Sequence, residues 1–94
     1  MQQLQVARIK QEGTVLLLVF VPPETTFFHD GQRARLRDIL IQALQEHNLI
    51  GELVVVWEFE GEIQFMGNPH WVEFIQGSGY ANLYGQRNTH IVVK

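Results

Sequence analysis

Apolar residues follow two different patterns along the chain, and these patterns predict its elements. Residues 2–10 alternate loosely between apolar and polar side chains, which is typical of a strand with one buried face. Residues 14–21 and 52–59 are almost continuous apolar runs, as in strands that are buried on both faces. From about residue 30 to about residue 48, helical spacing gathers the apolar side chains on one face, namely Leu36, Ile39, Leu40, Ala43, Leu44 and His47.

Turn-forming residues separate these segments and add three smaller ones. Pro22 and Pro23 end the second strand, and Asp30 is the expected N-cap of the helix. A turn at 60–62 predicts a hairpin partner at 63–66. Asn68 and Pro69 begin a short helix that should end at Gly77, followed by a loop over 77–89 and a last strand over 90–93.

The resulting order is β-β-α-β-β-α-β within a single domain, residues 1–94. It predicts an α+β fold, with one mixed sheet of about five strands and two helices in a ferredoxin-like or related sandwich. The side chains that we expect in the core are Leu16, Leu18, Phe20, Leu36, Leu40, Leu44, Val55, Trp57 and Phe74.

The amino-acid composition indicates a folded domain and argues against a disordered, disulfide-linked or membrane-spanning protein. Of the 94 residues 46% are hydrophobic and only 18% are charged, so disorder is not expected. Cysteine is absent, which excludes disulfides and thiol nucleophiles. The longest apolar run, Val15 to Val21, is far shorter than the roughly 20 residues that span a bilayer, and the first residues do not resemble a signal peptide. We therefore expect a cytoplasmic protein with no membrane partner.

The charge distribution argues against nucleic acid as a partner. The formal net charge is −3, and it comes from the second half of the chain. The one basic cluster, Arg33, Arg35 and Arg37, does not form a single helical face. Nucleic-acid-binding domains normally present a basic face, so we do not expect a nucleic-acid partner.

No catalytic constellation stands out. The single serine, Ser78, lacks the outer glycines of a nucleophile elbow, and no phosphate-binding glycine loop occurs. No two histidines have the spacing that aligns imidazoles on a helix. The acidic residues Glu58, Glu60 and Glu62 fit a solvated hairpin tip. We expect no catalytic residue, cofactor or metal. The absence of a catalytic constellation favours a protein that is not an enzyme.

The loop before the long helix is the first candidate site. His29 and Arg33 flank a helix N-terminus, where unpaired N–H groups attract anions. The alternative is an ordinary capped helix, with Phe27 or Phe28 packed back against it.

The segment from Asn68 to His90 is the second candidate site. It concentrates aromatic and amide side chains of the kind that recognition surfaces use. The alternative is a loop that wraps the sheet and packs its tyrosine rings. The candidate binding residues are His70, Trp71, Tyr80, Asn82, Tyr84, Arg87 and His90.

Self-association is the third expectation. Two helices of the expected lengths cover one face of five strands but not two, which would leave an exposed apolar patch unless the Asn68–His90 segment folds back as a lid. Such a patch commonly meets its copy across a two-fold axis. The residues predicted to form it are Val15, Leu17, Val19, Val54 and Val56.

These observations favour a small non-enzymatic binding or assembly module that acts through protein–protein contacts and forms a homodimer or higher oligomer. The alternative is a small-molecule or anion-binding regulatory domain, or a small enzyme, that uses the loop after the second strand and the His70–His90 segment. Convergence of His29, Arg33, His70 and His90 in one concave pocket would favour the alternative.

Overall fold

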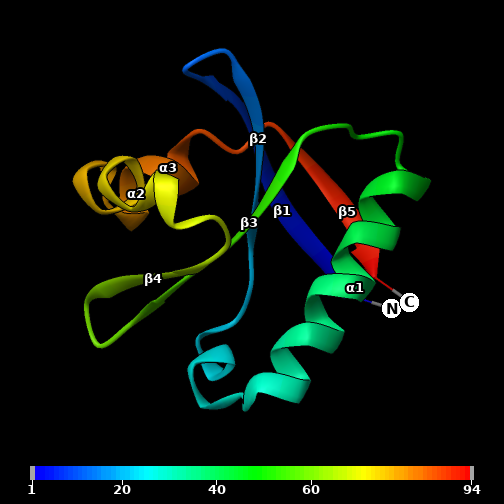
Figure 1. The fold of residues 1–94 in the computed structure, drawn as a ribbon, viewed down its shortest axis with the longest axis horizontal. Helices are drawn as coiled ribbons and strands as arrows, with labels where there is room; N and C mark the ends of the chain where they lie inside the picture. Colours follow the sequence, from blue (N-terminus) through cyan, green and yellow to red (C-terminus); the bar gives the residue numbers. More distant parts are fainter. Residues whose placement is uncertain (1, 94) are drawn as a thin grey trace.

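The computed structural model describes residues 2–93 as one five-stranded mixed sheet with helices on both faces (Figure 1). The strands lie in the order β4-β3-β2-β1-β5; β2 and β3 are parallel and the other pairs are antiparallel. This confirms the α+β class and the mixed sheet. The strand bounds are β1 Gln2–Gln11, β2 Thr14–Phe20, β3 Glu52–Phe59, β4 Glu62–Met66 and β5 Thr89–Val93.

One long helix covers one face of the sheet, and a pair of short helices covers the other. The crossover between β2 and β3 carries the 3₁₀ turn η1 (Pro23–Phe27) and α1 (Asp30–Glu46). The connection from β4 to β5 carries η2 (Pro69–Trp71), α2 (Val72–Ser78) and α3 (Tyr80–Gly85). In Figure 1, α1 lies on one side of the sheet and α2 and α3 lie together on the other. None of the helices within residues 2–93 is long and apolar enough to cross a lipid bilayer.

The alternation of apolar side chains divides the core in two, as the sequence predicted. The α1-side core gathers the odd-numbered residues of β2 and β3 with Leu40, Ala43 and Leu44. The α2-side core gathers their even-numbered residues with Trp71, Ile75 and Leu83. Of the nine side chains expected in the core, seven are buried and two are half-buried, Leu36 and Phe74.

The expectation of a loop over 77–89 is wrong. Gly79, at φ 81°, stops α2, and the chain then turns helical again as α3. Tyr80, Leu83 and Tyr84 have the i, i+3, i+4 spacing that places them on one helical face, and all three pack in or against the α2-side core.

Two tight turns and one helix cap fix the local geometry. Glu12-Gly13 and Glu60-Gly61 both have positive φ at each central residue, which identifies type I′ hairpin turns. The N-cap of α1 is His29 and not Asp30, because the imidazole, together with Gln32, forms a capping box one residue earlier.

The apolar patch predicted for self-association is not exposed. Leu17, Val19, Val54 and Val56 are each 1% exposed or less, and Val15 is half-buried. The parallel register pairs Leu17 with Leu53 and Leu18 with Val54, so the predicted residues belong to two opposite faces. One face lies under α1 and the other under α2 and α3, so the Asn68–His90 segment folds back over the sheet, which was the alternative to an exposed patch.

Candidate functional site

The loop before α1 uses its polar groups within the protein. His29 Nδ1 accepts from the Gln32 backbone N–H at 3.2 Å, and Gln32 Oε1 accepts from the His29 N–H at 3.0 Å. The Arg33 guanidinium donates to the carbonyls of Phe28 and Thr26 and lies 5.7 Å from the centre of the Trp57 ring. An anion bound here would compete with these internal bonds, so the geometry is that of a capped and braced helix start.

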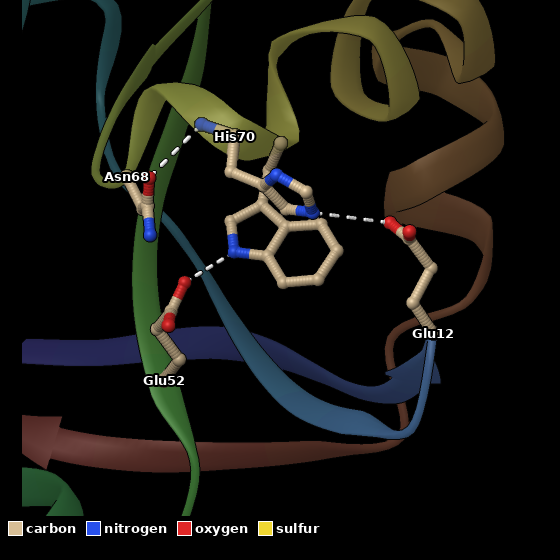
Figure 2. Close-up of polar contacts among 5 residues, drawn as sticks. Glu12, Glu52, Asn68 and His70 are labelled. Carbon is tan, nitrogen blue, oxygen red and sulfur yellow. Dashed lines mark hydrogen bonds and ion pairs between the residues drawn. The ribbon is translucent and has the colours of Figure 1, made fainter.

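The start of the second candidate segment is fastened to the sheet at two points (Figure 2). Trp71 is buried, and its indole N–H donates to the Glu52 carboxylate on β3. His70 Nε2 lies 3.4 Å from the Glu12 carboxylate at the β1–β2 turn. Both side chains of that ion pair are 60% exposed, so water screens it and it contributes little to stability. Trp71 is therefore a core residue, whereas His70 is at the surface.

Three further residues of this segment, Tyr80, Tyr84 and Arg87, form an aromatic cluster against Phe20 of β2. The rings of Tyr80 and Tyr84 stack at 5.8 Å, and both meet Phe20 edge to face. Arg87 lies 4.3 Å above the Tyr84 ring and donates to the Tyr84 carbonyl. Burial raises the pKa of Tyr80, with smaller contributions from Tyr84 and Glu58. The packing alternative thus accounts for both tyrosines.

The candidate residues do not converge in one pocket. His29 and Arg33 lie at the start of α1, near the end of β2, whereas His70 lies beside the turn where β2 begins. His90 is exposed on β5, and its side chain points to the face opposite Ile91, which belongs to the α1-side core. Asn82 is exposed on α3. The convergence that would have favoured the regulatory or enzymatic alternative is therefore not found among these residues.

A groove that the sequence did not predict lies on the α1 side of the sheet. It runs between the second half of α1 and the strands β3 and β4, and its volume is about 690 Å³. We call it the α1–β3 groove. Its apolar lining residues are Leu17, Ile41, Leu44, Leu49, Ile50, Leu53 and Met66.

The margins of the groove carry its polar groups. Arg37 and Gln45 line it from α1, and Glu52 and Asn68 from the sheet side. The Glu52 carboxylate already accepts from Trp71, whereas no ion pair or hydrogen bond within residues 2–93 engages the Arg37 guanidinium. Arg37 is thus the one charged side chain of the lining that has no hydrogen-bond or ion-pair partner in the described part of the chain.

The most exposed large apolar side chain lies at the mouth of this groove. Ile50 is 85% exposed, and the next, Phe27 at 73%, lies on the same side of the sheet but at the other end of β3, against Phe59. In the sequence, Ile50 belongs to a short apolar pair, Leu49-Ile50, that lies between the turn-forming residues Asn48 and Gly51. Only the fold brings it beside Ile41 and Leu53, so no local signal pointed to the groove.

Two further findings concern metal binding and similarity to known proteins. Within residues 2–93, no three histidine, aspartate or glutamate side chains are grouped closely enough to hold a metal ion. Comparison with models of known protein families, with curated proteins and with solved structures finds no match to the chain.

Proposed function

We propose that the protein is a non-enzymatic binding module that docks an amphipathic helix of a protein partner in the α1–β3 groove. The observation that carries this proposal is the strip of sheet that α1 leaves uncovered. Neighbouring strands lie about 4.8 Å apart, so five strands extend over roughly 19 Å from first to last. A helix is about 10 Å wide, so α1 covers about half of that face.

The uncovered strip, at the start of β3 and along β4, has the chemistry of a helix-docking surface. Its floor is apolar, with Leu53 and Met66 only half-buried and Ile41 rising beside them from α1. A helix that enters with apolar residues at i, i+3, i+4 and i+7 would cover this floor and meet Ile50 at the edge. Contacts of this kind, with an apolar centre and a polar margin, are typical of protein–protein interfaces.

Charge selects among such helices. Arg37 lines the groove without an acidic partner in the described part of the chain. A carboxylate on the entering helix would form a charge-assisted hydrogen bond with its guanidinium. The preferred partner therefore carries glutamate or aspartate beside its apolar face, and a basic helix is disfavoured.

A binding experiment with a defined peptide tests the proposal. The probe is a capped synthetic helix with leucines at i, i+3, i+4 and i+7 and glutamates on its other face; the matched probe has lysines in place of the glutamates. Titration into ¹⁵N-labelled protein should shift the amide signals of Gly51 and Gly67, which line the groove. We expect the acidic peptide to bind more tightly, and Arg37→Glu to reverse that preference.

A pair of matched variants locates the contact. Ile50→Ser should weaken binding of the acidic peptide about tenfold, because burial of an isoleucine contributes about 1.5–3 kcal/mol. Phe27→Ser removes the other strongly exposed apolar side chain, at the far end of β3, and should leave binding unchanged. Equal affinity for the two peptides, or shifts confined to residues outside the groove, would contradict the proposal.

A further inference from the structure

The two edge strands of the sheet, β5 and β4, differ in whether another part of the chain bonds to their outward-facing backbone groups. On the β5 edge, the Val92 N–H donates to His47 Nε2 at 3.1 Å, at the end of α1. On the β4 edge, none of the hydrogen bonds found within residues 2–93 reaches residues 62–66 from outside the β3–β4 pair. The β4 edge is therefore open.

The β3–β4 turn determines which backbone groups face outward from that edge. A two-residue type I′ turn makes Phe59–Glu62 the hydrogen-bonded closing pair, and bonded and non-bonded pairs then alternate along the ladder. Gln64 therefore bonds to β3, whereas the N–H and C=O groups of Ile63 and Phe65 point away from it.

The β1–β2 hairpin has the same kind of turn and shows the alternation directly. Counting from its closing pair, Gln11–Thr14, residue Arg8 must face away from β2. Its N–H and C=O are in fact bonded by the Asn88 side chain, at 2.9 and 3.0 Å, on the side away from β2. The same rule applied to β4 therefore identifies Ile63 and Phe65 as its outward residues.

The β4 edge also lacks the features that keep edge strands apart. Natural edges are commonly protected by lysine, proline or a bulge. The sequence of β4, Glu-Ile-Gln-Phe-Met, has no lysine or proline and a single charge, Glu62. Its four remaining side chains are half-buried, so a pairing strand would find little charge to displace.

We propose that two copies of this chain join by antiparallel pairing of β4 with β4 across a two-fold axis at Gln64. In this register Ile63 lies opposite Phe65 of the partner subunit, and each such pair exchanges both of its backbone hydrogen bonds. The two sheets become one continuous sheet of ten strands, built from the five of each copy. The inference is argued from the edge of the sheet and not from the groove, with which the junction shares Met66.

Side-chain complementarity selects this register. The pairing of Ile63 with the partner's Phe65 is an aromatic to β-branched contact, which stabilises neighbouring strands. Glu62 lies opposite the partner's Met66, so the two carboxylates are at opposite ends of the junction. Centring the axis on Ile63 instead would place Phe65 opposite the partner's Gly61 and lose both aromatic pairs.

A charge at the two-fold position tests the proposal. Gln64 meets its own copy in a non-bonded pair, where Cα atoms are about 4.5 Å apart. Gln64→Lys therefore sets two like charges face to face and should raise the dimer dissociation constant about tenfold or more. Gln42→Lys makes the same change on the exposed side of α1 and should leave the dimer intact. Sedimentation at high micromolar concentration measures both.

Two further measurements keep the test specific. Mixing Gln64→Lys with Gln64→Glu should restore a dimer that neither variant forms alone. In the wild type, exchange of the Ile63 and Phe65 amide hydrogens should slow as concentration rises. Ile50→Ser should dimerise like wild type, so failure of groove binding and failure of dimerisation are distinguishable. A wild-type monomer at high micromolar concentration, or an undiminished dimer in Gln64→Lys, would overturn the proposal.

Discussion

At the scale of single residues, polar side chains near the core mostly serve to fix packing. The indole N–H of Trp57 donates to Thr26 Oγ1 at 2.6 Å, and that of Trp71 donates to Glu52. A buried indole N–H without an acceptor would destabilise the fold, so these partners let large rings enter both cores. Among residues 2–93, no buried side-chain nitrogen or oxygen lacks a hydrogen-bond partner.

Tyr80 gives a pH prediction at this scale. Its pKa is raised in the folded state, chiefly by burial and then by Tyr84 and Glu58, above the value of about 10 expected for the unfolded chain. The stabilisation is therefore complete below about pH 10 and is lost as pH rises through the raised folded value. The melting temperature of wild type should fall in this alkaline range.

Tyr80→Phe isolates that contribution. The variant keeps the ring against Phe20 but has no ionisable hydroxyl, so its melting temperature should fall less steeply above about pH 10. Thermal unfolding followed by circular dichroism measures both curves. Parallel curves for the two proteins would show that the Tyr80 hydroxyl does not couple to folding.

At the scale of elements, one asparagine extends a strand pair beyond its regular end. The side chain of Asn88 bonds the N–H and the C=O of Arg8, and its own N–H donates to the Val6 carbonyl. Asn88 thus continues the β1–β5 ladder across the point where the chain leaves α3. This residue has no signature in the sequence, because its partners are 80 positions away.

Asn88→Ala should destabilise the protein by about 1–2 kcal/mol. The change removes two hydrogen bonds to backbone groups of β1, each with a net contribution of about 0.5–1.5 kcal/mol. Asn82→Ala is the matched control, since Asn82 is exposed on α3 and the variant should be close to wild type. Urea unfolding compares the two; an equal free energy of unfolding would mean that water replaces the amide without loss.

At the scale of the whole molecule, the two cores share one sheet. Leu16 and Leu17 are successive residues of β2, and they point into the α2-side core and the α1-side core respectively. Neither core can lose the central strands without exposing the other. For a domain of this size, we therefore expect a single cooperative unfolding transition.

The two tryptophans allow that expectation to be measured. Trp57 lies in the α1-side core and Trp71 in the α2-side core, and the chain has no other tryptophan. Trp71→Phe leaves fluorescence from the first core, and Trp57→Phe leaves fluorescence from the second. In each variant, the fluorescence transition in urea should coincide with the circular dichroism transition. A core that melts separately would appear as a fluorescence midpoint displaced from the backbone transition.

Local periodicity in the sequence identified the five strands, α1 and the faces of the central strands, but it missed α3. Alternation in residues 14–21 and 52–59 correctly separated the side chains of the two cores, because a strand repeats every two residues whatever it pairs with. Helical spacing likewise identified Leu40, Ala43 and Leu44 as the buried face of α1. These are local properties, set by backbone geometry and by the burial of apolar side chains.

How those faces are covered, and what is left open, depends on contacts between segments that are distant in the sequence. Periodicity shows that β2 and β3 each have two apolar faces. It does not show which face of β2 lies on the same side of the sheet as which face of β3. The β2–β3 register and the restart of the helix at Tyr80 buried the predicted patch. The groove and the open edge of β4 follow from the order of the strands in the sheet. Strand order is set by contacts between distant segments, and local patterns do not record it.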